Sequence, residues 1–165
     1  MKLADLFLEQ LERATRATRR TVERVPDGKS TWAPHAKSMQ LGYLANLVAS
    51  MPSWIGMMID RDFLDLGNYA GGPRASTGAE LAALFDKSAA DARRALSNAT
   101  DEHLLKPWQL RVSGNVVDEK PRYQQIADTF THLAHHRGQL TVYLRLNNVA
   151  VPQIYGPTAD EAWGA

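Results

Sequence analysis

The 165-residue sequence contains no cysteine. This absence excludes disulfide bonds, zinc–thiolate sites and a cysteine nucleophile. It also means that cysteine usage does not indicate whether the protein works in an oxidising or a reducing compartment. An excess of one charge is lacking as well, because 19 basic and 18 acidic residues give a formal net charge of +1. A balanced charge provides no overall field that would attract nucleic acid or an anionic membrane. We therefore expect neither nucleic acid nor membrane among the partners of this protein.

Long apolar runs are also missing. No stretch reaches the roughly 18 consecutive apolar residues of a membrane span. The first residues, MKLADLFLEQ, carry acidic side chains early and lack the apolar core of a secretory signal. From these features we predict a cytoplasmic protein. The length, with 44% hydrophobic and 22% charged residues, is typical of one globular domain, which we predict over residues 1–165.

Apolar residues recur at helical spacing in four parts of the chain. We predict helices from Leu3 to about Val25, from Ser38 to about residue 59, from Thr77 to about Thr100, and from Pro121 to about Asn147. Pro52 should kink the second helix or split it in two. Ser38 is the expected N-cap of that helix. Thr77 and Glu80 have the spacing of a capping box, which should open the third helix.

The regions between the helices have different character. Trp108–Val112 and Val116–Val117 are short β-type runs around a Ser-Gly-Asn turn, so they predict a small hairpin. Residues 60–74 are predicted to form a loop, and the tail from Asn148 is predicted to cross the helices without long regular structure. Together these features predict an all-α four-helix bundle with a short hairpin-like excursion before the last helix.

Three of the five histidines lie within Thr129–Leu146, in the last predicted helix. His132 and His136 are four residues apart and therefore share one helical face, with Cβ atoms about 5–6 Å apart. Two imidazoles at this spacing can bind the same metal ion. The alternative is a hydrogen-bonded polar pair in the bundle interior. Bundle cores commonly host metal sites on facing helices, which makes this pair the first candidate site.

Five segments resemble the DinB superfamily, and in particular its YfiT-like metalloenzymes. They are WAPHAKSM (residues 32–39), LGYLA (41–45), MPSW (51–54), HLAHHRGQ (132–139) and PQIYGP (152–157). The resemblance implies a four-helix bundle, usually a homodimer, with a divalent metal such as nickel or zinc held by three histidines. Two of these ligands match His132 and His136.

Gly138 lies in the middle of the last predicted helix, where glycine lowers helix stability by about 1 kcal/mol relative to alanine. Its presence indicates close approach of another helix or of a partner subunit.

The third metal ligand of the family belongs to the second helix, in a phrase that reads LGYLANL here. Its position falls on Leu47, which has no lone pair. The resemblance therefore implies a degenerate histidine triad. Asn46, one register step away, or His35, just before the helix, are the imaginable substitute ligands.

Further residues around the histidine pair are candidates for a ligand pocket. Gln139 and Tyr143 lie one to two turns along the helix, on or near the same side, and Tyr143 can donate a hydrogen bond to a bound ligand. The PQIYGP turn can bring Tyr155 near the mouth of the bundle. With His35 and Asn46, these tyrosines complete the predicted pocket.

Two functions are considered. The first, which the resemblance implies, is a metal-dependent thiol transferase, in which the ion stabilises a thiolate. The cosubstrate then supplies the sulfur, which agrees with a chain without cysteine. The second is a metal-free module, small-molecule-binding or stress-associated and dimeric, that keeps the bundle without catalysis. The missing third histidine argues against the first function, and the two retained histidines argue against complete loss of the site.

Overall fold

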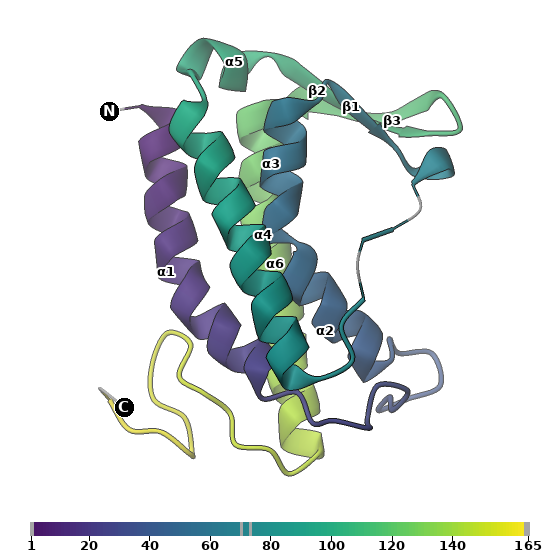
Figure 1. Cartoon of the computed structure of the whole chain (residues 1–165), viewed down its shortest axis with the longest axis vertical. Coiled ribbons are helices and arrows are strands. Elements are labelled where there is room, and N and C mark those ends of the chain that lie inside the picture. Colours follow the sequence, from purple (N-terminus) through teal and green to yellow (C-terminus); the bar gives the residue numbers. More distant parts are fainter. Residues whose placement is uncertain (1, 70, 73, 164–165) are drawn as a thin grey trace.

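A computed structural model of the protein describes residues 2–69, 71–72 and 74–163 (Figure 1). The α-helices are α1 (Leu3–Glu23), α2 (Leu41–Ser50), α3 (Pro52–Asp60), α4 (Gly78–Asn98), α5 (Asp101–Leu105) and α6 (Arg122–Leu146), and the strands are β1 (Phe63–Asp65), β2 (Pro107–Val112) and β3 (Asn115–Pro121). A short 3-10 helix, η1, covers Leu66–Asn68. Within these ranges, no helix combines the length and the apolar content needed to cross a membrane.

The predicted all-α four-helix bundle is wrong, because the chain also builds a sheet. The long helices α1, α4 and α6 run beside the α2–α3 pair, and three strands lie across one end (Figure 1). The sheet has the order β1-β2-β3 and is mixed. Strands β2 and β3 pair antiparallel, which confirms the predicted hairpin, whereas β1 pairs parallel to β2.

Strand β1 lies in the stretch 60–74 that we predicted as a loop, of which residues 70 and 73 lie outside the described ranges. Its three residues carry no local strand signal. They become a strand because Phe63 pairs with Gln109 of β2, far along the chain. Pairing between distant segments depends on tertiary context, which overrides local propensity. The correction to the fold class therefore arises from a long-range contact.

Pro52 splits the second predicted helix into α2 and α3, one of the two outcomes expected. It occupies the first position of α3, where a missing N–H leaves no intrahelical bond unmade. The predicted N-cap at Ser38 is wrong, since Gln40 precedes the helix without a side-chain cap. The N–H of Ser38 donates instead to the carbonyl of His35 at 2.9 Å, which ties Ser38 into a separate turn.

Side-chain caps explain where the later helices begin. The capping box of α4 is confirmed, because Thr77 Oγ1 accepts from the N–H of Glu80 at 3.2 Å and the Glu80 carboxylate accepts from the N–H of Thr77. Thr100, expected near the end of this helix, caps the additional helix α5 through the N–H of His103. Helix α6 follows Pro121, close to its predicted start.

The core consists of two apolar clusters that follow each other along α6. One is built around Phe85, Leu133 and Leu140, and the other around Leu104, Ile126 and Phe130. Trp54 of α3 packs against both clusters. This side chain therefore lies where the two clusters meet, at the level of the histidines on α6.

The described part of the tail, residues 147–163, has no long regular structure, as expected, and ion pairs attach it to α1. The Glu161 carboxylate accepts hydrogen bonds from Arg20 at 2.7 Å and Arg24 at 2.5 Å, and it also accepts from the N–H of Gln153. These bonds hold residues 153–161 against the C-terminal turns of α1.

Candidate functional site

The structure brings His132 and His136 into direct contact on α6. Their Nε2 atoms lie 2.8 Å apart, and their ring centroids are 4.6 Å apart. His136 is 5% exposed, whereas His132 is exposed. The pair therefore reaches from the junction of the core clusters to the protein surface, and its outer imidazole is accessible to a ligand.

Gln139 sets the direction of hydrogen bonding through the pair. Its Oε1 lies 2.7 Å from Nδ1 of His136. Because a carbonyl oxygen can only accept, Nδ1 of His136 donates and its Nε2 carries a lone pair. That lone pair accepts a hydrogen bond from Nε2–H of His132. Both imidazoles are then neutral, and Nδ1 of His132 carries the lone pair that the chain of hydrogen bonds leaves unused.

The surroundings of His132 favour its uncharged form. The Trp54 ring centroid is 5.7 Å from that of His132, and His135 lies against His136 at 4.9 Å. Partial burial lowers the pKa of His132 below its ordinary value of 6.5, and the neighbouring imidazoles of His136 and His135 lower this pKa further. His132 is therefore a neutral hydrogen-bonding group at pH 7.

The third donor that a metal centre would need is not supplied by the predicted substitutes. Leu47 packs against the apolar core cluster. The Asn46 amide is fully engaged with the segment before α4: its Nδ2 donates to the carbonyls of Gly42 and Ala75, and its Oδ1 accepts from the N–H of Ala75 at 2.7 Å. His35 lies in an exposed turn, where its Nδ1 accepts from the N–H of Lys37.

The donor set does not fit a resident metal ion. In the described part of the chain, no group of three or more histidine or carboxylate side chains is arranged to hold an ion. Protein metal sites normally supply three or four ligands, and the histidine pair supplies two. The 2.8 Å between the two Nε2 atoms is an ordinary hydrogen-bond length.

The predicted pocket tyrosines make contacts of their own. Tyr143 donates to the carbonyl of Met39 at 3.2 Å, which joins α6 to the segment before α2. Tyr155 is 81% exposed, and its hydroxyl accepts from Nη2 of Arg137 at 2.7 Å. Among the described residues, neither tyrosine hydroxyl hydrogen-bonds to the histidine pair. Trp54, which belongs to the MPSW segment of the family resemblance, is the aromatic neighbour of His132.

A second polar centre lies at the end of the molecule that carries the sheet, and it was not predicted. Its core is Arg122, which is 1% exposed at the start of α6. Its guanidinium donates to the carbonyls of Met58, Lys106, Pro107 and Arg61 and to Oδ1 of Asp62. All five N–H groups are engaged, so Arg122 ties α3, β2 and α6 together. No local pattern distinguishes this arginine from a surface residue.

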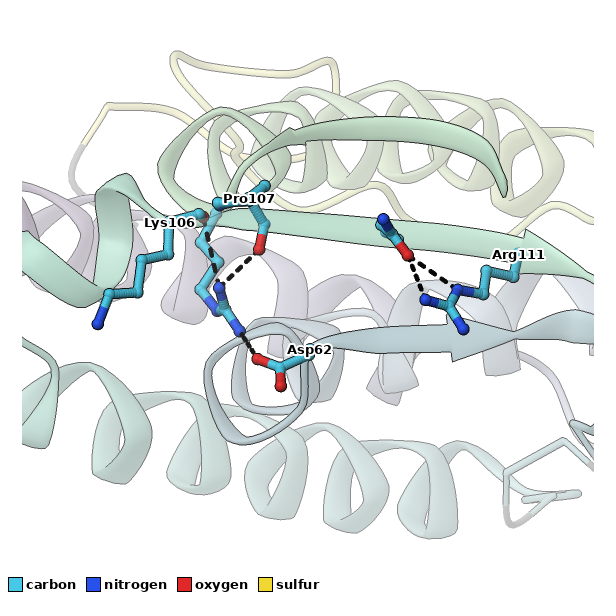
Figure 2. A pocket seen from close by; sticks show the side chains of 6 residues that line it. Asp62, Lys106, Pro107 and Arg111 are labelled. Carbon is cyan, nitrogen blue, oxygen red and sulfur yellow. Dashed lines mark hydrogen bonds and ion pairs between the residues drawn. The ribbon is translucent and has the colours of Figure 1, made fainter. Parts of the chain in front are cut away.

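A cavity of about 360 Å³ adjoins Arg122. It is lined by Asp62, Lys106, Pro107, Gln109, Arg111 and Arg122 (Figure 2). His132 and His136 are not among these residues. The cavity and the histidine pair are therefore separate sites.

Comparisons with known proteins agree with this architecture. The model of the DinB family matches residues 1–164. The chain is 34% identical over 76 residues to the uncharacterized protein YrdA of Bacillus subtilis, a match that covers 44% of the chain and 46% of YrdA. The chain thus spans about half the length of this relative.

Two solved structures have the same fold. A DinB-like protein from Bacillus cereus, 22% identical, superposes with a TM-score of 0.70 over 90% of this chain and 95% of its own. The DinB-like protein YjoA from Bacillus subtilis, 15% identical, also gives 0.70, over 90% and 97% of the two chains. At these identities, the likeness establishes the fold alone.

Proposed function

The chain belongs to the DinB family, and from this premise we propose that it is a metal-independent member whose His132–His136 pair binds a small, weakly acidic molecule. The observation that carries the proposal is the 2.8 Å contact between the two Nε2 atoms, together with the bond from Nδ1 of His136 to Gln139. A low-molecular-weight thiol is the ligand class that the family resemblance favours.

The proposed chemistry uses only this chain's side chains. A thiol S–H donates a hydrogen bond to Nδ1 of His132, which stays neutral. The imidazole is held ready to accept because its Nε2–H donates to the lone pair of His136, whose own Nδ1–H donates to Gln139. Trp54 provides an apolar surface beside His132 for the rest of the ligand. The result is a bound thiol that donates to a neutral imidazole, with no covalent bond broken.

A ligand pair tests this proposal. Glutathione and S-methylglutathione differ in the S–H group, so titration of each while the imidazole NMR signals are followed isolates its role. We expect saturable shifts at His132 with the thiol and at least several-fold weaker binding of the methylated compound. His132→Ala should remove the response, and His35→Ala, in an exposed turn, should retain it. Equal binding of both compounds, or no saturable binding, would contradict the proposal.

Metal independence has its own test. Purified untagged protein is analysed for bound metal, and its melting temperature is then measured with added zinc or nickel. We expect substoichiometric metal and an unchanged melting temperature, because two imidazoles provide fewer ligands than the three or four of typical sites. A stoichiometric metal, or a melting temperature that rises in the wild type but not in His132→Ala, would instead support a metal-dependent thiol transferase.

We also propose that the protein is a homodimer, and the surroundings of Gly138 support this. In the part of the chain that the structure describes, a Cβ built at Gly138 meets no atom within 4 Å. No other helix of the described chain packs closely against Gly138, so the helix that approaches it would belong to a partner subunit. Val142 and Leu146, one and two turns along α6, are 57% and 55% exposed, which supports an apolar contact between copies.

Light scattering tests the dimer directly. The wild type is expected to have twice the chain mass, and Val142→Glu is expected to be a monomer because the charge would be buried in the contact. A wild type that stays monomeric at high concentration would contradict the homodimer.

Cytoplasmic localisation and association with stress also stay predictions, to be tested by cell fractionation and by measuring protein abundance after oxidant treatment.

A further inference from the structure

The cavity beside Arg122 has the features of a ligand site that is separate from the histidine pair. Helix α6 rises about 1.5 Å per residue, so His132 lies roughly 15 Å along the helix from Arg122. The cavity is bordered by the start of β2 and by Asp62 just before β1 (Figure 2). Its volume of about 360 Å³ is in the range of small-molecule sites. The inference that follows does not depend on the proposed function.

Three cations line the cavity, and two of them are already paired. Nη2 of Arg122 lies 2.6 Å from Oδ1 of Asp62, and Nζ of Lys106 lies 3.2 Å from Glu102. Among the described residues, no carboxylate lies within 4.0 Å of the Arg111 guanidinium nitrogens. The positive charge of Arg111 is therefore the one in this cavity that an anion can neutralise.

The neighbour of Arg111 in β1 does not neutralise it. Asp65 pairs in register with Arg111, but its carboxylate accepts hydrogen bonds from the backbone N–H groups of Gly67, Ser113 and Gly114. These bonds hold the pKa of Asp65 below its ordinary value, with a smaller contribution from the charge of Arg111. The Asp65 carboxylate is thus committed to the turn between β2 and β3.

Arg111 is held in a fixed orientation. Its Nε and Nη2 donate to Oε1 of Gln109, with the Nε bond at 2.9 Å; dashed lines in Figure 2 mark these bonds of Arg111. Its Cζ lies 3.9 Å from the centroid of the Phe63 ring. These contacts use one N–H of Nε and one of Nη2. The remaining three N–H groups have no partner among the described residues. They include the parallel pair on the Nη1–Nη2 edge, which matches the two oxygens of a carboxylate.

We propose that this cavity binds a small monocarboxylate through the Nη1–Nη2 edge of Arg111. The fixed guanidinium lowers the conformational entropy lost on binding. The charge balance favours a monoanion, because Arg122 is paired with Asp62 and Lys106 with Glu102, which leaves Arg111 as the one lining cation without a carboxylate partner among the described residues.

The experiment follows the Arg111 Nε–H and the backbone amides of residues 108–112 by NMR during titration with sodium acetate, sodium chloride and inorganic phosphate at matched ionic strength. We expect saturable shifts with acetate only. Arg111→Gln should abolish saturation, and Arg111→Lys should weaken binding several-fold because a point charge replaces the planar fork. The matched control Arg93→Gln removes an arginine that pairs with Glu12 on α1 and should bind acetate like the wild type.

A second variant keeps the test informative if Arg111→Gln unfolds. Phe63→Leu leaves the charge and removes the ring beneath it, and we expect acetate binding to weaken several-fold with the fold intact. Acetate shifts equal to those of chloride, or an unchanged acetate response in Arg111→Gln, would overturn the proposal. Saturable phosphate binding of equal or greater strength would overturn the assignment to a monocarboxylate.

Discussion

Helix α6 carries two polar centres that differ in how completely their hydrogen-bonding groups are used. At its first residue, Arg122 donates all five N–H groups to partners in α3, β2 and the loop before β1. Ten residues later, His132 and His136 bond to each other and to Gln139, all on the same helix. The first centre joins separate elements, whereas the second leaves a lone pair of His132 available.

This difference separates stability from function. A guanidinium with every donor engaged holds the fold together and has no capacity left for a ligand. A neutral imidazole pair that reaches from the core to the protein surface can accept a hydrogen bond from a small molecule. Both centres would count as polar residues on a core helix, and only their partners distinguish them.

The largest expected effect comes from removing the structural centre. Arg122→Ala removes the guanidinium donor of four backbone carbonyls, of which that of Lys106 keeps the backbone N–H of residue 122. The site is 1% exposed, and we expect the free energy of unfolding to fall by about 3 kcal/mol. Urea denaturation measures this change. Asp62→Asn is the matched variant: the Asp62 side chain is 90% exposed, so its loss should cost about 1 kcal/mol or less. Equal effects of both variants would contradict the structural role assigned to Arg122.

A second change tests whether the histidine centre is one ligand short of a metal site. Leu47→His restores the position that the family resemblance assigns to the third ligand, and we expect zinc affinity to rise by about 100-fold, or roughly 2.7 kcal/mol. Competition with a chromophoric chelator gives the affinity. Asn46→His is the control for register and should leave zinc affinity near that of the wild type. A folded Leu47→His variant without added affinity would show that Leu47 is not the ligand position.

Gln139 provides a smaller effect on the same centre. Gln139→Leu removes the acceptor of the His136 Nδ1–H bond, and we expect a loss of about 1 kcal/mol or less in unfolding free energy. The more specific result is a mixture of His136 tautomers in imidazole NMR spectra. Gln124→Leu, which removes an exposed amide bonded to Tyr123, serves as the control. A single unchanged tautomer in Gln139→Leu would contradict the role of Gln139.

The smallest effect is a dependence of stability on pH. Because the pKa of His132 is lower in the folded chain than its ordinary value of 6.5, the unfolded chain takes up this proton first as the pH falls. The contribution of His132 is therefore complete above pH 6.5 and is lost as the pH drops toward the folded pKa. Urea midpoints between pH 8 and pH 5 should fall less steeply in His132→Gln than in the wild type. Identical slopes would contradict the lowered pKa.

Local signals predicted much of the fold. The Thr77–Glu80 capping box, the start of α6 after Pro121 and the β2–β3 hairpin all depend on residues close in sequence, and all three are confirmed. Strand β1 depends on pairing with β2, and α5 is a single turn capped by Thr100. Neither has the length or periodicity that makes a sequence pattern readable, so the mixed sheet was missed.

The candidate site could be predicted only in part. Helical spacing was sufficient to bring His132 and His136 together and to put Gln139 on their side. The contact with Trp54 and the five-donor network of Arg122 depend on how separate elements pack, and no spacing within one helix encodes this. The engagement of Asn46 with Ala75 is likewise a long-range contact.

The most direct test of the central claim is a long-range ¹H–¹⁵N NMR spectrum of the imidazoles in the wild type at pH 7.5 without added metal. We predict that His132 is the neutral Nε2–H tautomer and His136 the neutral Nδ1–H tautomer, as the 2.8 Å contact and the bond to Gln139 require. A charged imidazolium at either position, or an Nε2–H tautomer of His136, would contradict a neutral, metal-free histidine pair.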